Sequence, residues 1–272
     1  MRAKAESANV YKTSLFGVVA PSLGWAPPLR YLLRRAQILD VLKAVPCGAL
    51  LEVGCGSGAL LDDLATLGHR VTGLESSSAA LRMASAIATA TGNGQVVVGA
   101  PQTDWVGAHD VLCAFDVLEH IEDDGAAIDL WRSWLKPGGS LLISVPAHRS
   151  RWGAGDVWAG HWRRYDQADL LGLLGAHDLR IKHVECYGFP LANLTEWLGQ
   201  RSYRRMLSRQ GAALSKADAS ASSGIDRGAY LSLFRYIDTG VGRMLLRLCL
   251  LMQRLTIRTN LGSGYLVLAE RQ

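Results

Sequence analysis

The run LLEVGCGSGALL, residues 50–61, holds three glycines at alternate positions, Gly54, Gly56 and Gly58. An apolar, strand-like segment precedes them and a helical pattern follows, so they form a turn between a strand and a helix. Glycine suits such a turn because a side chain would keep the backbone away from a ligand, and because the turn uses backbone angles that other residues resist. Alone, the run is weak evidence of a site, since similar turns also connect strands to helices without binding anything.

Two acidic residues strengthen the pattern. Glu52 stands two residues before the first glycine, and Glu75 ends the next predicted strand, where an acid can bind both hydroxyls of a ribose. Dinucleotide sites use G-x-G-x-x-G to seat a pyrophosphate on a helix N-terminus. This turn instead reads E-x-G-x-G-x-G, with the acid where a cationic amino-acid portion of a ligand would lie. The pattern predicts a ligand with a ribose and an ammonium group and no phosphate, and it disfavours a nucleotide-dependent oxidoreductase.

Alternating β-rich runs and helical patterns begin at residue 49, which indicates parallel strands joined by crossover helices. Strands are predicted over residues 49–53, 70–75, 95–99, 110–115, 140–146, 180–187 and 264–270. Helices are predicted over residues 29–44, 58–67, 77–89, 122–135 and 166–176, the last with Asp166 as its N-cap and Asp169 at the capping-box position. We expect an α/β fold with a doubly wound sheet, whose carboxyl edge carries the glycine turn.

The composition indicates a folded chain with a mild positive charge. Of the 272 residues, 49% are apolar and 19% are charged, which excludes a disordered or fibrous protein, and the net charge of +5 does not by itself argue for nucleic acid. The most apolar window, residues 244–252, is far shorter than the roughly 20 residues that span a bilayer. The cysteines are widely spaced and form no C-x-x-C pair, so we expect a cytoplasmic protein with reduced thiols and no metal site.

Four motifs, in this order and spacing, resemble those of class I S-adenosylmethionine-dependent methyltransferases: EVGCGSG, the acid at Glu75, FDVLEHI (115–121) and LKPGGSLLISVP (135–146). The resemblance covers about residues 29–187, and GHWRRY (160–165) is similar to a bacterial subgroup with diverse substrates. It implies a Rossmann-like sheet of seven strands that ends in an antiparallel hairpin. The chain is then expected to have three parts: an N-terminal helical segment (1–48), a cofactor-binding core (49–188 plus 261–272) and a helical insertion that forms a substrate lid (189–260).

The resemblance implies S-adenosylmethionine as the cofactor. The glycine turn would lie along its methionine portion, Glu75 on its ribose, and the end of the fourth strand near its sulfonium. Many family members have an aspartate after the third strand that contacts the adenine amine, and here a backbone amide or Gln102 would replace it. Arg35 resembles an arginine that lies near the cofactor carboxylate in related proteins. The expected cofactor residues are Arg35, Glu52, Gly54, Cys55, Gly56, Ser57, Gly58, Glu75, Ser76, Ala100, Pro101, Gln102, Phe115 and Asp116.

Two histidines are candidates for catalysis, His120 in FDVLEHI and His161 in GHWRRY. A hydroxyl acceptor needs a base, and an imidazole with its ordinary pKa near 6.5 can accept a proton at neutral pH. A carboxylate acceptor attacks without one, and an anionic acceptor would be held by arginine. A purely structural role for His120 stays open. The expected substrate residues are Trp152, Arg163, Arg164 and Tyr165.

Residues 189–260 differ in composition from the rest of the chain. They contain eleven basic and four acidic residues, a net charge of +7. Residues 216–228 are rich in Ala, Ser and Gly and are expected to form a loop, whereas residues 241–257 have a basic amphipathic pattern. The segment is a solvated face, a lid over the substrate or a patch for an anionic membrane. Its position between the last two strands favours the lid, and its charge favours an acidic or lipid-like acceptor.

The sequence therefore predicts a methyltransferase that acts on a small-molecule, lipid-like or peptide acceptor, with O-methylation of a hydroxyl or carboxylate as the favoured reaction. C- or N-methylation of a biosynthetic intermediate and a non-catalytic scaffold with the same fold remain the alternatives. No nucleic-acid partner is expected, because no N-P-P-Y-like motif follows the fourth strand. A peripheral membrane contact and a homodimer stay open.

Overall fold

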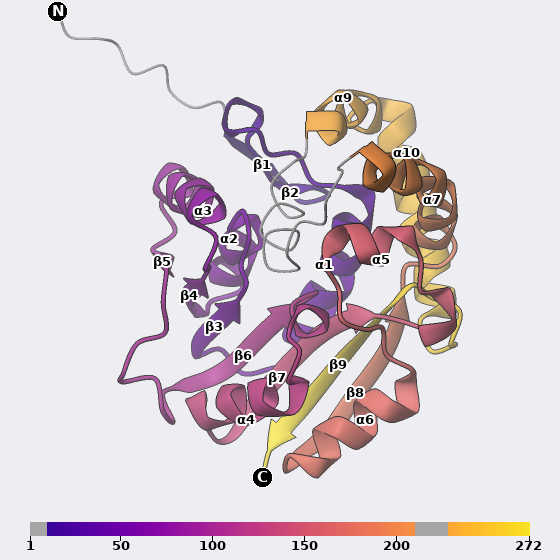
Figure 1. The fold of residues 1–272 in the computed structure, drawn as a ribbon. Coiled ribbons are helices and arrows are strands. Elements are labelled where there is room, and N and C mark those ends of the chain that lie inside the picture. Colours follow the sequence, from indigo (N-terminus) through magenta and orange to yellow (C-terminus); the bar gives the residue numbers. More distant parts are fainter. Residues whose placement is uncertain (1–9, 210–227) are drawn as a thin grey trace, which may run out of the picture.

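A seven-stranded sheet forms the centre of the computed structural model, which describes residues 10–209 and 228–272 (Figure 1). The strand order is β5-β4-β3-β6-β7-β9-β8. The first five strands of this order run parallel, and β9 lies antiparallel between β7 and β8. The predicted sheet with a terminal antiparallel hairpin is therefore confirmed. The strands are β3 (Ala49–Val53), β4 (Arg70–Leu74), β5 (Val96–Val98), β6 (His109–Phe115), β7 (Leu135–Pro146), β8 (Leu179–Tyr187) and β9 (Gly264–Arg271).

Helices cover both faces of the sheet. Helices α1 (Leu29–Leu42), α2 (Ala59–Thr66) and α3 (Ser78–Thr91) contribute to the core on one face, and α4 (Asp124–Trp134) and α6 (Gln167–Ala176) to the core on the other. Leu50 and Leu51, neighbours in β3, are both fully buried but belong to different cores. Successive strand residues point to opposite faces, so a strand covered on both sides is apolar throughout.

The N-terminal part differs from the prediction of a helical segment. Before α1, the chain forms a two-stranded antiparallel sheet of β1 (Tyr11–Thr13) and β2 (Gly17–Val19), then a 3₁₀ turn at Pro21–Leu23. The reason is local: Gly17 has φ +70°, and the β-branched Val18 and Val19 that follow it are fully buried.

In the described residues between β8 and β9, the chain forms the helices α7 (Leu191–Arg209), α9 (Gly228–Ile237) and α10 (Gly240–Thr256). A further short helix, α5 (Ala154–Ala159), precedes GHWRRY. The loop expected over residues 216–228 lies outside the described residues except for Gly228, which begins α9. Within the parts of the chain that the structure describes, no helix combines the length and apolar character needed to cross a membrane.

Helix α6 begins where predicted, but the expected capping box does not form. The side chain of Asp166 makes no cap bond and instead accepts a hydrogen bond from the backbone N–H of Arg149 (3.1 Å). Asp169 is paired with the guanidinium of the same arginine (3.2 Å). Both acids are therefore used to hold the segment after β7.

A buried ion pair joins α1 to α2. Nε of Arg35 donates to Oδ2 of Asp63 (2.6 Å) and Nη2 donates to Oδ1 (2.8 Å), and both residues are nearly fully buried. The remaining terminal nitrogen donates to the carbonyl oxygens of Ser14 and Leu15 (3.2 and 3.4 Å). Because each partner satisfies the other away from water, removal of one leaves an uncompensated charge in the interior.

We expect Asp63→Asn to lower the free energy of unfolding by about 3–5 kcal/mol, the cost of breaking a buried pair from one side. Urea denaturation monitored by circular dichroism measures this. Lys43→Ala is the matched control, because the pair between Lys43 and Asp40 is largely exposed and is worth less than about 1 kcal/mol. Equal losses in the two variants would contradict a structural role for the buried pair.

Candidate active site

The glycine turn after β3 is bound to the end of β4 through its backbone and through Glu75. The N–H groups of Gly54 and Cys55 donate to the carbonyl of Leu74 (2.8 and 3.1 Å). The buried carboxylate of Glu75 accepts from the N–H groups of Gly56 and Ser77, both at 2.8 Å. Each carboxylate oxygen can accept a second hydrogen bond, so Glu75 is both fixed in position and able to bind two hydroxyls.

The three glycines serve different purposes. All have positive φ, but a Cβ at Gly54 would lie 2.6 Å from Val117 and one at Gly58 would lie 2.9 Å from Ala84. At Gly56 a Cβ would meet nothing within 4 Å. Gly54 and Gly58 are therefore needed for packing, and Gly56 is the position of the three where the turn borders open space that a ligand can occupy.

Glu52, in β3, is buried and its Oε2 has no hydrogen-bond partner among the described residues. Burial raises the pKa of its carboxyl to about 8, although the positive charge of Arg34 opposes the change. A buried acid without a partner is costly unless something binds it. A ligand ammonium would supply the missing partner, and the cofactor role expected of Glu52 stays a prediction.

The remaining expected cofactor residues divide by exposure. The side chains of Cys55 and Ser57 are buried, and burial raises the pKa of the Cys55 thiol well above its usual value, so these two residues offer a ligand chiefly their backbone. Ser76, Ala100, Pro101 and Gln102 are exposed after β4 and β5, and the Gln102 side chain donates to the carbonyl of Ala100 (2.8 Å). These parallel strands end at one edge, so the exposed residues lie on the same edge as Glu75.

Asp116, which follows β6, is paired with two arginines of α1. It forms ion pairs with Arg34 and with Arg30 (Nε at 3.8 Å), and it accepts a hydrogen bond from Oγ of Ser144 (3.0 Å). Burial alone would raise the pKa of Asp116, but the two arginines outweigh it and lower the pKa to about 2. The preceding Phe115 is buried, and the guanidinium of Arg34 lies 5.8 Å from its ring centroid.

This arrangement corrects the expectation for Arg35. Residues 30 and 34 are one helical turn apart and face the same side of α1, whereas residue 35 is turned away by about 100°. Arg30 and Arg34 therefore lie at Asp116, and Arg35 is engaged by Asp63. The guanidinium of Arg35 is therefore used inside the protein, and the arginines beside Asp116 are Arg30 and Arg34.

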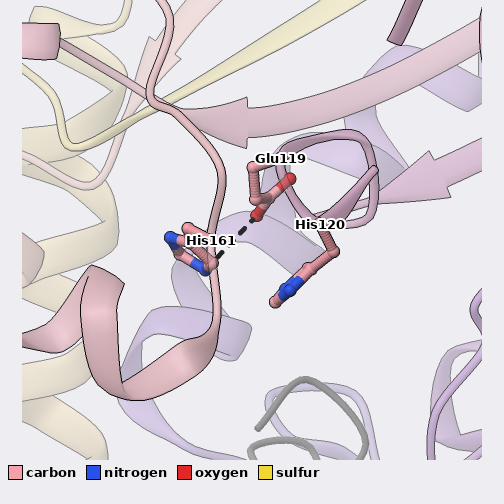
Figure 2. A group of neighbouring side chains, drawn as sticks. All are labelled: Glu119, His120 and His161. Carbon is pink, nitrogen blue, oxygen red and sulfur yellow. Dashed lines mark ion pairs between the residues drawn. The ribbon is translucent and has the colours of Figure 1, made fainter. Parts of the chain in front are cut away.

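Figure 2 shows that Glu119, His120 and His161 come together. Asp116 is close enough to interact electrostatically with all three. The 3₁₀ turn Leu118–His120 holds the first two, and His161 comes from the loop after α5. The two imidazole rings meet edge to face with centroids 4.7 Å apart. Glu119 is completely buried, neither of its side-chain oxygens has a hydrogen-bond partner among the described residues, and Nε2 of His161 lies 4.0 Å from its Oε1. The sequence named both histidines but missed Glu119, although it stands next to His120 in the same motif.

The charges in this cluster are set by burial and by Asp116. Burial raises the pKa of Glu119 well above its usual value, and the negative charge of Asp116 raises it further. Burial and the neighbouring His161 lower the pKa of His120 to about 4. One ligand atom from each of the three residues lies within 4.8 Å of the others, and a glutamate with two histidines is a donor set that zinc and other transition metals accept. The cluster can therefore exchange protons or hold a cation.

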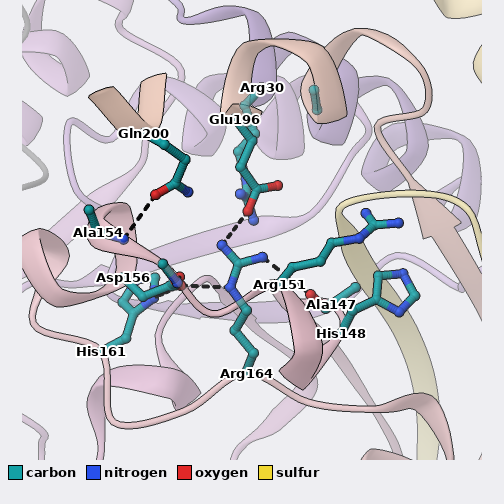
Figure 3. Close-up of polar contacts among 12 residues, drawn as sticks. Arg30, Ala147, His148, Arg151, Ala154, Asp156, His161, Arg164, Glu196 and Gln200 are labelled. Atoms are coloured by element: carbon teal, nitrogen blue, oxygen red, sulfur yellow. Dashed lines mark hydrogen bonds and ion pairs between the residues drawn. The ribbon is translucent and has the colours of Figure 1, made fainter. Parts of the chain in front are cut away.

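Arg164 corrects another expectation, since its guanidinium is used inside the protein. It is buried, donates to Oδ1 of Asp156 (2.7 Å) and to the carbonyl of Ala147 (3.3 Å), and forms an ion pair with Glu196 of α7 (Figure 3). It therefore cannot clamp an acceptor. Asp156 also accepts from Nδ1 of His161 (2.9 Å), and although burial opposes it, these partners lower the pKa of Asp156 to about 2.

The other expected substrate residues line a pocket of about 620 Å³, between the segment after β7 and the start of α4 and α6. Its charges are balanced: Arg163 is paired with Asp124 (2.5 Å), and the hydroxyl of Tyr165 donates to the same carboxylate (2.8 Å). Trp152 is partly exposed at this pocket. The structure brings the predicted residues together, but the arginines here already have carboxylate partners. The pocket lining comprises Asp124, Arg149, Trp152, Arg163, Arg164, Tyr165, Asp169 and Leu173.

Comparison with known proteins agrees with this geometry. The chain is 37% identical over 116 residues, 41% of its length, to a ubiquinone biosynthesis O-methyltransferase of Albidiferax ferrireducens, of which it covers 46%. It spans about half the length of the curated relatives it matches. Among solved structures, the [4+2]-cyclase SpnF matches with a TM-score of 0.58 at 18% identity (89% of this chain, 81% of that one). Geranyl diphosphate C-methyltransferase from Streptomyces coelicolor matches with a TM-score of 0.51 at 13% identity (88% and 79%), and at such identities only the fold is shared.

The sheet order, the glycine turn with its two acids and the open space at Gly56 define a class I methyltransferase with S-adenosylmethionine as its cofactor. Residues 29–214 match the family described as methyltransferase domain, and the chain belongs to that family. The predicted class and cofactor are confirmed.

We expect S-adenosylmethionine binding at pH 7 to release close to one proton, because Glu52, with a pKa of about 8, must ionise beside the ligand ammonium. Calorimetry in buffers of different ionisation enthalpy measures this number, and Glu52→Gln should reduce it to about zero. Zero release in the wild type would contradict the assignment.

Glu52 should also make the stability of the ligand-free protein depend on pH. Its pKa in the folded state lies above the ordinary 4.5, so its contribution to the free energy of unfolding is lost as the pH rises towards about 8. Glu52→Gln should remove that dependence.

Proposed function

We propose that the protein transfers the methyl group of S-adenosylmethionine to a hydroxyl oxygen of a small-molecule acceptor, with His161 as the general base. The relatives named ubiquinone biosynthesis O-methyltransferase support the oxygen acceptor. They match over less than half of this chain, so the reaction is argued from the site itself.

The observation that carries the proposal is the hydrogen bond between Asp156 and His161. A carboxylate only accepts, so Nδ1 of His161 carries the hydrogen and Nε2 keeps its lone pair. Nε2 lies 4.0 Å from Oε1 of Glu119, in the turn after β6, and the family resemblance implies that the sulfonium lies near the end of β6. The hydrogen bond to Asp156 fixes the tautomer and the orientation of the ring. A nucleophile, its base and a group that orients the base are the usual components of such a site.

His120 has a different part in this proposal. Its pKa of about 4 keeps it neutral, so it is a weak base but can hydrogen-bond the acceptor oxygen. Two imidazolium rings 4.7 Å apart would repel each other, which favours protonation of only one. Asp116 is held ionised by Arg30 and Arg34, and its charge is already neutralised by them.

Bound S-adenosylmethionine supplies the methyl group on a sulfonium. In the transfer, the acceptor oxygen forms a bond to the methyl carbon, the carbon–sulfur bond breaks with its electron pair going to sulfur, and the hydroxyl proton moves to Nε2 of His161 and then to water. The protein has to align the acceptor with the methyl group and exclude water. Glu119, as a neutral acid, leaves this part of the site without an extra negative charge.

The helical insertion forms a wall of the proposed acceptor site. Glu196 in α7 forms an ion pair with the guanidinium of Arg164 (Figure 3), and Oε1 of Gln200 accepts from the N–H of Ala154 (2.9 Å). These contacts fasten α7 to α5 and to the loop that carries His161. Because Arg163 and Arg164 are both paired with acids, we propose a hydroxyl-bearing, lipid-like acceptor in preference to an anionic one.

We expect His161→Gln to lower kcat about 10²–10⁴-fold on a phenolic or alcoholic acceptor, the range for a lost general base, with the Kd for S-adenosylmethionine within twofold of wild type. The measurement is S-adenosylhomocysteine formation across a panel of hydroxylated, carboxylated and amine acceptors, with the product bond identified by NMR. His177→Gln is the control, because His177 pairs with Asp129 on the surface.

Four outcomes would contradict the proposal. Turnover of His161→Gln at the wild-type rate would exclude the base, and a product methylated on carbon or nitrogen would exclude the O-acceptor. Loss of wild-type turnover with a chelator, restored by Zn²⁺, would show that Glu119, His120 and His161 hold a cation and that His161 is a ligand. Failure to bind S-adenosylmethionine at all would support a scaffold.

A further inference from the structure

Helix α10 presents an apolar stripe to solvent. Seven of its large apolar side chains are between 48% and 78% exposed. They recur at intervals of one and three residues, which at about 100° per residue confines them to an arc of about 120° on one side of the helix. Scattered exposed apolar residues are ordinary, but a continuous stripe marks an interaction surface. The stripe consists of Val241, Met244, Leu245, Leu248, Leu251, Met252 and Leu255.

The opposite side of α10 is fixed to the core, so the helix cannot roll to bury the stripe. Gln253 is completely buried, its Nε2 donates to the carbonyl of Leu33 in α1 (3.0 Å), and its Oε1 accepts from the N–H of Gly188 after β8 (2.7 Å). Leu246, two turns earlier on the same side, is buried as well. A buried glutamine with both ends bonded sets the rotation of the helix about its axis.

The charges of α10 indicate what covers the stripe. The helix contains no Asp or Glu, and Arg247 and Arg254 lie along one flank of the stripe, about 100–120° from its centre. Arg247 is exposed and makes no ion pair with any residue in the described ranges, and Arg254 reaches Asp40 only through an exposed pair (2.8 Å). An apolar stripe beside a row of arginines is the pattern of a helix that lies in a membrane interface.

We propose that α10 seats the protein on an anionic lipid surface, with the stripe in the boundary between headgroups and acyl chains and with Arg247 and Arg254 at the lipid phosphates. A second copy of the chain fits less well, because two such helices would bring arginine rows together with no acid in either helix to compensate. A surface contact, as opposed to a span, agrees with the absence of a membrane-crossing helix among residues 10–209 and 228–272.

The test is sedimentation of the full-length protein with phosphatidylcholine vesicles that contain or lack phosphatidylglycerol. We expect binding to the anionic vesicles that weakens as salt is added. Leu248→Asp with Leu251→Asp should reduce it more than tenfold, and Arg247→Gln about fivefold, the effect of about 1 kcal/mol per basic residue. Both substituted leucines are about half exposed, so the fold should persist, which circular dichroism checks.

Leu130→Asp is the matched control, because Leu130 is also about half exposed but lies on α4, away from α10 (Figure 1). No partition into anionic vesicles, or equal binding by the double variant and the wild type, would overturn the proposal. A concentration-dependent dimer that the double variant abolishes, without vesicle binding, would overturn it in favour of a second copy. Affinity for S-adenosylmethionine should be the same in all variants, so this result is independent of whether the proposed O-methylation holds.

Discussion

A carboxylate inside a protein has to be paired, protonated or met by a ligand, because an isolated charge is too costly to keep in a medium of low dielectric constant. The site contains two kinds of buried acid, those that are paired within the protein and those that are not. Asp116 and Asp156 are paired with arginines and a histidine, and the pKa of each is lowered to about 2. Glu52 and Glu119 have unpartnered oxygens, and burial raises the pKa of each. The paired acids hold the site in shape, and the unpaired ones are where something else has to bind or a proton has to reside.

The paired acids also explain how parts outside the sheet reach the site. Arg30 and Arg34 come from the helix before the sheet and meet Asp116. Glu196 comes from the insertion and meets Arg164, which in turn holds Asp156 and so orients His161. In the site we propose, the core strands and their turns form the cofactor side, and two additions that ion pairs fasten to the carboxyl edge form the acceptor side. Relatives that share only the core can therefore share the cofactor and differ in the acceptor.

The sequence could predict the features that depend on local patterns, and it could not predict those that depend on partners far away in the chain. The glycine turn and the alternating strands and helices are local patterns, and the structure confirms them together with the sheet of seven strands and its terminal antiparallel hairpin. The roles of individual arginines could not be read from spacing, because they depend on partners far away in the chain: Arg35 is taken by Asp63, and Arg164 by Glu196. Glu119 was missed for a related reason, since its burial depends on the loop that brings His161 against it. Asp166 had the right residue type for a cap, but Arg149 binds its carboxylate instead.

The strand order also separates the side of the site expected to bind the cofactor from the side next to α10. The exposed residues expected near the adenosine follow β4 and β5, at one end of the sheet, whereas α10 packs on α1 and on the end of β8, at the other (Figure 1). A polar cofactor entering from water and a lipid-like acceptor entering from a membrane surface would then not compete for one opening. Helix α1 connects α10 to Asp116, because the carbonyl of Leu33 accepts a hydrogen bond from Gln253 and the next residue, Arg34, pairs with Asp116. A membrane bound to α10 would therefore be linked through α1 to the proposed point of methyl transfer.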